Sequence, residues 1–196
     1  GESEELLEFK KERTEVEMKG DDDSYRWALV RPLSLQEVTT STKAKISVKF
    51  KLSEPRGVYV GVFVVHSKES SIFMKEISGN PEDSHLIPDK GKDIGFAMVG
   101  CYSGQVIVKQ PATREGENEF HNHGYLGDKR ISIYEVEYLP GGNVSFFIHT
   151  QKEGRVLHGD PVKLDEAHMV EKHGEDALLV FATGIANSSW TASVSS

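Results

Sequence analysis

Residues 45–52 alternate strictly between apolar and polar side chains, and this alternation constrains the fold more than any other feature of the sequence. The apolar set is Ile46, Val48, Phe50 and Leu52, and the polar set is Lys45, Ser47, Lys49 and Lys51. Because successive side chains of a β-strand point to opposite faces, a period of two predicts a strand with one face on a core and the other in water. Lysines on an exposed strand also discourage pairing with the edge of another molecule.

A second strand is predicted directly after a turn signal. Residues 58–65 are almost continuously apolar and mostly β-branched, a composition typical of a strand that is buried on both faces. The intervening Glu54-Pro-Arg-Gly57 supplies the residues of a turn. We therefore predict that 45–52 and 58–65 pair as a hairpin.

Another hairpin is predicted between residues 130 and 150. The runs 131–139 and 144–149 flank Pro140-Gly141-Gly142-Asn143, whose proline fixes φ and whose glycines allow the positive φ values of a tight turn. Within the first run, Glu135 and Glu137 alternate with apolar and aromatic residues. We interpret these two carboxylates as the solvent face of a strand rather than as a catalytic pair.

Shorter strands and two long connections complete the expected order of elements. The strands are predicted at 71–77, 93–100, 105–108 and 177–183, and the long connections at 78–92 and 111–128. Seven or eight strands with turns at short intervals are typical of a sandwich or barrel. The predicted fold is therefore mainly β, an antiparallel β-sandwich of the jelly-roll or concanavalin-like kind, with one N-terminal amphipathic helix.

That helix is predicted over residues 3–19. The segment is rich in Glu, Lys and Leu, and Leu6, Phe9 and Val16 lie at roughly helical spacing. Residues 20–24, which contain a glycine and three aspartates, then break the helix and form a linker. We expect a solvated helix that packs a narrow stripe on the body, or alternatively a partner-binding or coiled-coil end.

The charge of the chain is concentrated in the same region. Residues 1–23 carry ten acids and four bases, and the whole chain has a net charge of −8. The rest of the chain is close to neutral and lacks the basic excess that dominates nucleic-acid binding, so no nucleic-acid partner is expected. The predicted units are 1–23 for the acidic helix and linker, 24–186 for the sandwich and 187–196 for a polar C-terminal tail.

Hydropathy and cysteine content indicate in which cellular compartment the protein is expected. No stretch approaches the roughly 18 to 20 apolar residues that a membrane-spanning helix needs, so no membrane span is expected. Cys101 is the only cysteine and cannot form an intrachain disulfide, which favours a reducing compartment. We expect a cytoplasmic location rather than secretion.

Residues that could support catalysis or metal binding do not form a recognisable motif. The sequence has eight histidines, of which His121 and His123 lie closest, but none completes a familiar metal-ligand spacing. Cys101 adjoins an apolar run, where a buried and inert thiol is expected. There is no nucleophile elbow, phosphate-binding glycine loop or dinucleotide fingerprint. We therefore expect no metal, no cofactor and no enzymatic activity.

Aromatic and cationic residues around the connection 111–128 are the preferred binding candidates. Tyrosine, tryptophan and arginine are enriched at binding hot spots because they bury much area for little lost rotamer freedom. The predicted recognition residues are Tyr102, Arg114, Phe120, His121, His123 and Tyr125. The alternative interpretation of this segment is a polar connection without function.

Three stretches resemble the SPRY family and the related neuralized-homology repeat. Residues 45–52 followed by Gly57-Val-Tyr-Val-Gly-Val62 look like the family's strand, turn and second strand. Gly127-Asp128, the strand after it and Gly142-Asn-Val-Ser-Phe-Phe147 are similar to a later hairpin of that family, and Arg31-Pro-Leu-Ser-Leu-Gln-Glu37 is similar to a motif of the neuralized repeat. This resemblance implies an antiparallel sandwich that recognises a peptide or protein through loops at one edge, without a cofactor.

The leading hypothesis is therefore a protein-interaction module with a protein or peptide partner. The first alternative is a structural, coat-like domain that self-associates through its termini, forming a homo-oligomer through the N-terminal helix. A carbohydrate-binding sandwich is the second alternative. An enzyme is the last, and would require the histidines and Cys101 to converge in one cleft.

Overall fold

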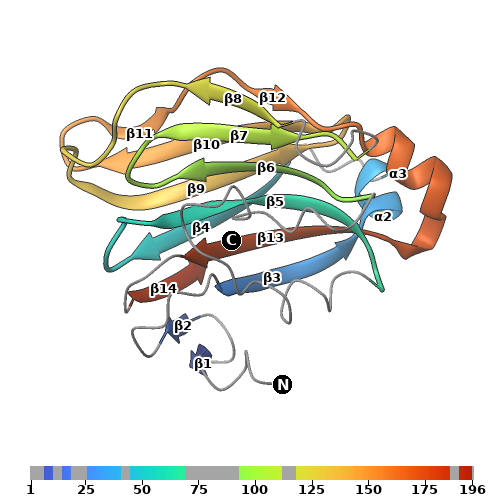
Figure 1. Cartoon of the computed structure of the whole chain (residues 1–196), viewed down its shortest axis with the longest axis horizontal. Helices are drawn as coiled ribbons and strands as arrows, with labels where there is room; N and C mark the ends of the chain where they lie inside the picture. Colours follow the sequence, from blue (N-terminus) through green and yellow to red (C-terminus); the bar gives the residue numbers. More distant parts are fainter. Residues whose placement is uncertain are drawn as a thin grey trace.

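A computed structural model shows two antiparallel sheets, which confirms the predicted mainly β sandwich (Figure 1). The structure describes residues 7–10, 15–18, 26–40, 45–68, 93–111, 118–185 and 190–195. Within these ranges, no helix has the length and apolar character needed to cross a bilayer.

The first sheet has eight strands. In spatial order they are β1 (Leu7–Lys10), β2 (Glu15–Met18), β14 (Trp190–Ser195), β4 (Ile46–Leu52), β9 (Ile131–Leu139), β10 (Asn143–Thr150) and β11 (Gly154–Leu157), with β12 (Val162–Lys163) also paired to β10. Each of these pairings is antiparallel.

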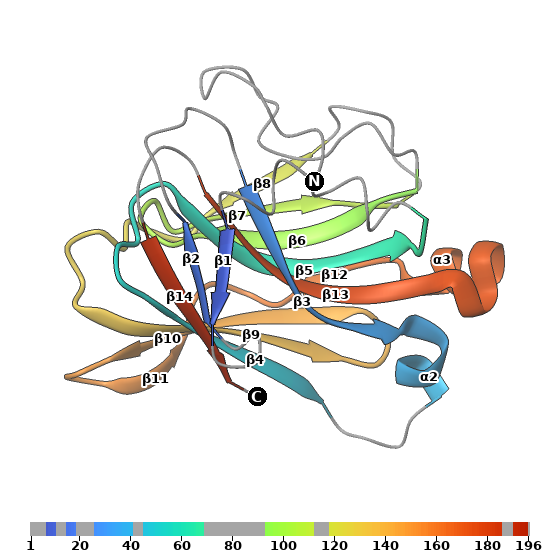
Figure 2. The same cartoon turned by 90° about the horizontal axis from the view of Figure 1, so that it is seen from below.

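The second sheet has six strands, and two short helices lie at one end of the sandwich. In spatial order the strands are β3 (Arg26–Ser34), β13 (Ala177–Ile185), β5 (Val58–His66), β6 (Gly95–Gly100), β7 (Gln105–Lys109) and β8 (Glu119–Asn122). The helices are α2 (Leu35–Thr40) and α3 (Glu166–His173), the second followed by the 3-10 turn η2 (Gly174–Asp176). Figures 1 and 2 both show α2 and α3 together at the same end.

The main core lies between the two sheets and is built from the inward-facing side chains, which occupy alternate positions along each strand. Phe50 of β4, Val136 of β9 and Phe146 of β10 face the valines of β5 there. A second buried apolar cluster, which includes Phe63, Phe96 and Ile107, occupies the other face of the six-stranded sheet. Strand β5 contributes to both clusters, as its continuous apolar sequence predicts.

The predicted hairpin of 45–52 with 58–65 is wrong, although both strands exist. Strand β4 pairs with β14 and β9, whereas β5 pairs with β13 and β6 in the opposite sheet. The turn between them, with Gly57 at a φ of 71°, therefore carries the chain from one layer to the other. Alternation fixes which face of a strand is buried, but it does not identify the neighbouring strand or the sheet to which the strand belongs.

The hairpin of β9 and β10 is confirmed. Leu139 pairs with Asn143 across the turn, and the register continues to Ile133 and His149. Gly142 adopts a φ of 82°, and a Cβ there would lie 2.0 Å from the carbonyl oxygen of Leu164. The turn therefore needs glycine for its backbone conformation and for its close contact with the chain before α3.

The predicted N-terminal helix is also wrong. The structure has strands β1 and β2 in that segment, with Leu7 opposite Met18 and Phe9 opposite Val16. Apolar residues at 7 and 9 and at 16 and 18 have a period of two, which the high Glu and Lys content of the segment obscured. The prediction of a homo-oligomer through this helix thereby loses the element on which it depended.

Trp190–Ser195 likewise forms a strand instead of the expected tail. It pairs on one side with β2 and on the other with β4. The predicted linker 20–24, the strand 71–77, the connection 78–92 and the boundary between 186 and 187 lie outside the described residues.

The outward face of β9 carries a buried charge network, which corrects the interpretation of its glutamates as a solvent face. Glu135 and Glu137 are only 4% and 8% exposed. Arg155 of β11 donates from Nε to Glu135 Oε2 over 3.0 Å, and from Nη2 to Glu135 Oε1 over 3.1 Å and to Glu137 Oε2 over 2.9 Å. Its guanidinium also lies 3.3 Å from the centre of the Phe147 ring.

Further donors complete the network across β4 and β10. Ser47 Oγ donates to Glu135 Oε1 over 2.5 Å, His149 Nε2 lies 2.7 Å from Glu135 Oε2, and Lys45 Nζ donates to Glu137 over 3.0 Å. Burial raises the pKa of Glu135, but hydrogen bonds from Arg155, Ser47 and His149 outweigh it and lower that pKa to about 2. The stability that this carboxylate provides is therefore present above about pH 4 and is lost as the pH falls toward 2.

Replacing Glu135 with glutamine tests this network. We expect Glu135→Gln to lower the free energy of unfolding by about 2 kcal/mol, because the amide leaves Arg155 partly unpaired and turns a donor toward other donors. Urea unfolding at neutral pH measures the change. The matched control Glu153→Gln, at an exposed turn, should stay within about 0.5 kcal/mol, and equal effects of the two variants would contradict a stabilising network.

Candidate functional site

Three connections meet at the end of the sandwich opposite α2 and α3 (Figure 1). They are the β4–β5 turn 53–57, the β6–β7 turn 101–104 and the loop 123–130 that follows β8, and we call them together the loop end. Loops on a rigid scaffold are where binding residues concentrate. The loop end is therefore the preferred candidate for a binding site.

Tyr102 and Tyr125, both predicted as recognition residues, contact each other at the loop end. Their ring centres are 4.9 Å apart at an interplanar angle of 82°, which is an edge-to-face contact. Tyr125 remains 45% exposed. Gly127 lies against both rings, because a Cβ at this position would be 2.4 Å from Tyr125 Oη and 2.5 Å from Tyr102 Cε2. The absence of a side chain at Gly127 is what allows the two rings to meet.

Arg56 joins these tyrosines from the β4–β5 turn. Its Nη2 donates to Tyr102 Oη over 3.3 Å, and its guanidinium carbon lies 5.0 Å from the Tyr102 ring centre. We call Arg56, Tyr102 and Tyr125 the arginine–tyrosine cluster. Sequence reasoning missed Arg56, and the only signal was an arginine within a turn that precedes a strongly apolar strand.

Hydrogen bonds from elsewhere in the fold hold the β6–β7 turn in place. The carbonyl oxygen of Cys101 accepts from the buried Tyr134 hydroxyl over 2.9 Å, and that of Tyr102 accepts from Leu126 N over 3.1 Å. His158 Nε2 lies 2.7 Å from the carbonyl oxygen of Gly104, so this nitrogen carries the proton and donates. The turn is therefore preorganised by the core and by two other connections.

The pKa values of the two tyrosine hydroxyls in the cluster are shifted in opposite directions. Hydrogen bonding with Tyr125, followed by the bond from Arg56, lowers the pKa of Tyr102. Hydrogen bonding with Tyr102 raises the pKa of Tyr125 to about 12. The two phenols therefore interact with each other at the centre of the cluster.

His121 and His123, the other predicted pair, form a row with His158 beside the arginine–tyrosine cluster. The rings of His121 and His123 are stacked, with centres 6.1 Å apart and planes within 2° of parallel, and His158 meets His123 edge-on at 5.9 Å. His121 lies on β8, a strand within the stretch predicted as a long connection. In the described part of the chain, no three potential ligands are placed to hold a metal ion.

The remaining predicted site residues are not part of the cluster. Phe120 is 57% exposed on β8, and strand alternation places its side chain on the opposite face from that of His121. Arg114 lies outside the described residues. Cys101 is fully buried, and burial raises the pKa of its thiol well above the usual value, as expected for an inert cysteine.

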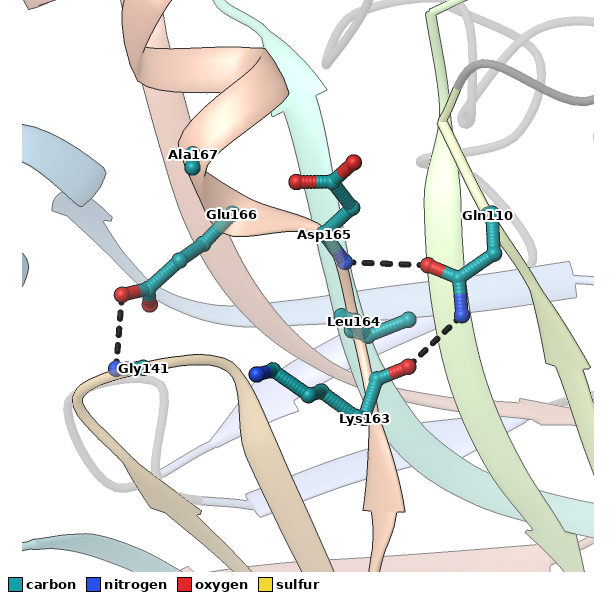
Figure 3. Close-up of a pocket in the computed structure, with 7 residues that line it drawn as sticks. All are labelled: Gln110, Gly141, Lys163, Leu164, Asp165, Glu166 and Ala167. Carbon is teal, nitrogen blue, oxygen red and sulfur yellow. Dashed lines mark hydrogen bonds between the residues drawn. The ribbon is translucent and has the colours of Figure 1, made fainter.

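A cavity of about 560 Å³ lies at the opposite end, at the start of α3 (Figure 3). Its lining residues are Gln110, Gly141, Lys163, Leu164, Asp165, Glu166 and Ala167. The side chain of Gln110 donates to the carbonyl oxygen of Lys163 over 2.6 Å and accepts from Asp165 N over 2.9 Å. Glu166 accepts from Gly141 N over 2.6 Å and from the Tyr138 hydroxyl. These polar groups are used to join β7, the β9–β10 turn and α3, so the loop end remains the stronger candidate site.

Comparison with known proteins supports the fold. No protein-family model and no curated protein sequence matches the chain. The PSpry domain of TRIM65 is 7% identical with a TM-score of 0.51, and the match covers 97% of this chain and 84% of that domain. Arcelin-5, a lectin-like defense protein from Phaseolus vulgaris, is 11% identical with a TM-score of 0.47, covering 97% and 90% of the two chains. At 7% identity the likeness to the TRIM65 domain is one of fold, that of a SPRY-like sandwich.

The pairing of the two tyrosines gives a spectroscopic prediction. We expect Tyr125→Phe to raise the pKa of Tyr102 toward about 10, because the interaction with the Tyr125 hydroxyl, the first cause of its lowering, is lost. Solution NMR of ring-labelled tyrosines, titrated with base, follows each phenol separately. Phe120→Ala should leave the pKa of Tyr102 unchanged, and an unchanged pKa in Tyr125→Phe would contradict the interaction between the two hydroxyls.

The support beneath the β6–β7 turn depends on pH. Burial lowers the pKa of His158, the bond to Gly104 opposes this, and His123 and Lys129 lower it further. In the unfolded chain a histidine titrates at about pH 6.5, so as the pH falls His158 is protonated in the unfolded state before it is protonated in the folded state. The free energy of unfolding therefore falls as the pH drops below about 6.5. Urea midpoints at about pH 7.5 and about pH 5.5 should differ less in His158→Gln than in the parent chain. If the urea midpoint falls equally in His158→Gln and in the parent chain, this role of His158 is refuted.

Proposed function

We propose that the chain is a non-enzymatic recognition module that binds a segment of a protein or peptide through its loop end. The observation that carries the proposal is the arginine–tyrosine cluster, in which residues from three connections meet at an accessible surface. Tyrosine and arginine are the residue types that most often dominate binding energy at protein interfaces.

The rigidity of the loop end supports this proposal. Tyr134, Leu126 and His158 each donate to a carbonyl oxygen of the β6–β7 turn, and Gly127 fixes how close the two tyrosine rings lie. A surface that is ordered before binding loses less conformational entropy when a partner arrives. The arrangement therefore suits recognition of a defined partner segment by loops that move little.

Two side chains near the β6–β7 turn, Cys101 and His158, support a binding role over catalysis by a thiol. The Cys101 thiol is buried, and its raised pKa keeps it protonated. His158, the histidine that supports the same turn, uses its Nε2 proton on the carbonyl oxygen of Gly104. The thiol and this imidazole therefore serve the packing of the turn.

Selection from a random peptide library displayed on phage, with the intact chain as bait, tests the proposal. We expect selected peptides to lose about tenfold or more in affinity for Tyr102→Ala and for Tyr125→Ala, because each change removes an aromatic contact at the centre of the surface. Gly127→Ala should weaken binding similarly by forcing the rings apart.

Gln36→Ala serves as the control, since this residue is exposed on α2, at the end of the sandwich opposite the loop end (Figure 1). It should change affinity by less than about twofold. Peptides that bind all four variants equally, or a selection that enriches no peptide, would refute recognition through the loop end.

A further inference from the structure

Within the described ranges of the chain, the Arg56 guanidinium donates a hydrogen bond only to a neutral group. Its one side-chain hydrogen bond, to the Tyr102 hydroxyl, is 3.3 Å long, whereas bonds from a guanidinium to a carboxylate are about 2.7–2.9 Å. Among the residues that the structure describes, no carboxylate lies within ion-pairing distance of its guanidinium. Glu54 Oε1 accepts instead from the backbone N of Arg56, over 3.0 Å.

The guanidinium is nevertheless held in a defined orientation. The Tyr102 ring lies beside it, and Tyr125 and Gly127 in turn hold Tyr102. A guanidinium has five N–H donors in a planar fork that matches the two oxygens of a carboxylate. With one donor directed at Tyr102, Arg56 keeps enough donors for such a bidentate contact.

The charges around the loop end favour an anion. Its exposed charged residues are Arg56, Lys129 and Arg130 against Glu54 and Asp128, an excess of one positive charge. The chain as a whole has a net charge of −8. An acidic segment is therefore favoured at this end over the average of the chain.

We infer that the partner segment carries an aspartate or glutamate whose carboxylate binds the fork of Arg56, with an adjacent side chain packed on Tyr125. This inference rests on the proposed function and adds the chemistry of the partner. Arginine and lysine are not equivalent at such a contact, because only the guanidinium can present two parallel N–H groups to the carboxylate.

The selected phage peptides provide the test, now through their composition and through variants of Arg56. We expect the peptides that bind the loop end to share an acidic residue at one position. Arg56→Gln should lower the affinity for these peptides about tenfold or more. Arg56→Lys, which keeps the charge but loses the planar guanidinium, should lower it about threefold or more. Arg130→Gln, a matched loss of an exposed arginine at the same end, should change affinity by less than about twofold.

Changing the shared acid of a peptide to its amide should produce the same loss for the parent chain and no further loss for Arg56→Gln, since both changes remove one contact. Peptides that depend on Tyr102 and Tyr125 but share no acid, or that bind Arg56→Gln as well as the parent, would overturn the carboxylate inference and leave the proposed function standing. If no peptide depends on the loop end, the proposed function fails and the inference fails with it.

Discussion

Two tyrosines on β9 hold both ends of the sandwich to its core. Tyr134 and Tyr138 point inward, so each buried hydroxyl must find an acceptor inside the protein. Tyr134 donates to the carbonyl oxygen of Cys101 at the loop end, and Tyr138 donates to Glu166 at the start of α3. The position of the β6–β7 turn, and with it the arginine–tyrosine cluster, follows from satisfying these hydroxyls.

Strand β9 is stabilised by apolar packing on its inward face and by ion pairs on its outward face. On its inward face β9 contributes to an apolar core, and on its outward face Glu135 and Glu137 are neutralised by Lys45, just before β4, and by Arg155 of β11. Carboxylates of such low exposure would be costly without these partners. Because β9 is the neighbour of both β4 and β10, its two faces together fix the register in the middle of the eight-stranded sheet.

Local sequence patterns predicted the parts of this structure that depend on neighbouring residues. The strands β4, β5, β9 and β10 and the turn at Gly141 and Gly142 follow from alternation and turn chemistry. Sheet membership does not, because β4 and β5 are adjacent in sequence and lie in opposite layers. Tyr102 and Tyr125 are candidates by residue type alone, whereas Arg56 reaches them from a distant turn and the burial of Glu135 depends on Arg155 from another strand. Such contacts arise from tertiary register, which a single sequence does not display.

Strand β14 lies between β2 and β4, so the order of assembly is constrained. During synthesis the N-terminal segment emerges first, but β2 cannot join the sheet until residues 190–195 have left the ribosome and taken their place beside it. Until then the outer edge of β4 is open, and its lysine side chains are the feature that discourages pairing with another nascent chain. Closing this side of the sheet is therefore a late, long-range step, and it should set the pace at which the whole sandwich becomes protected from aggregation.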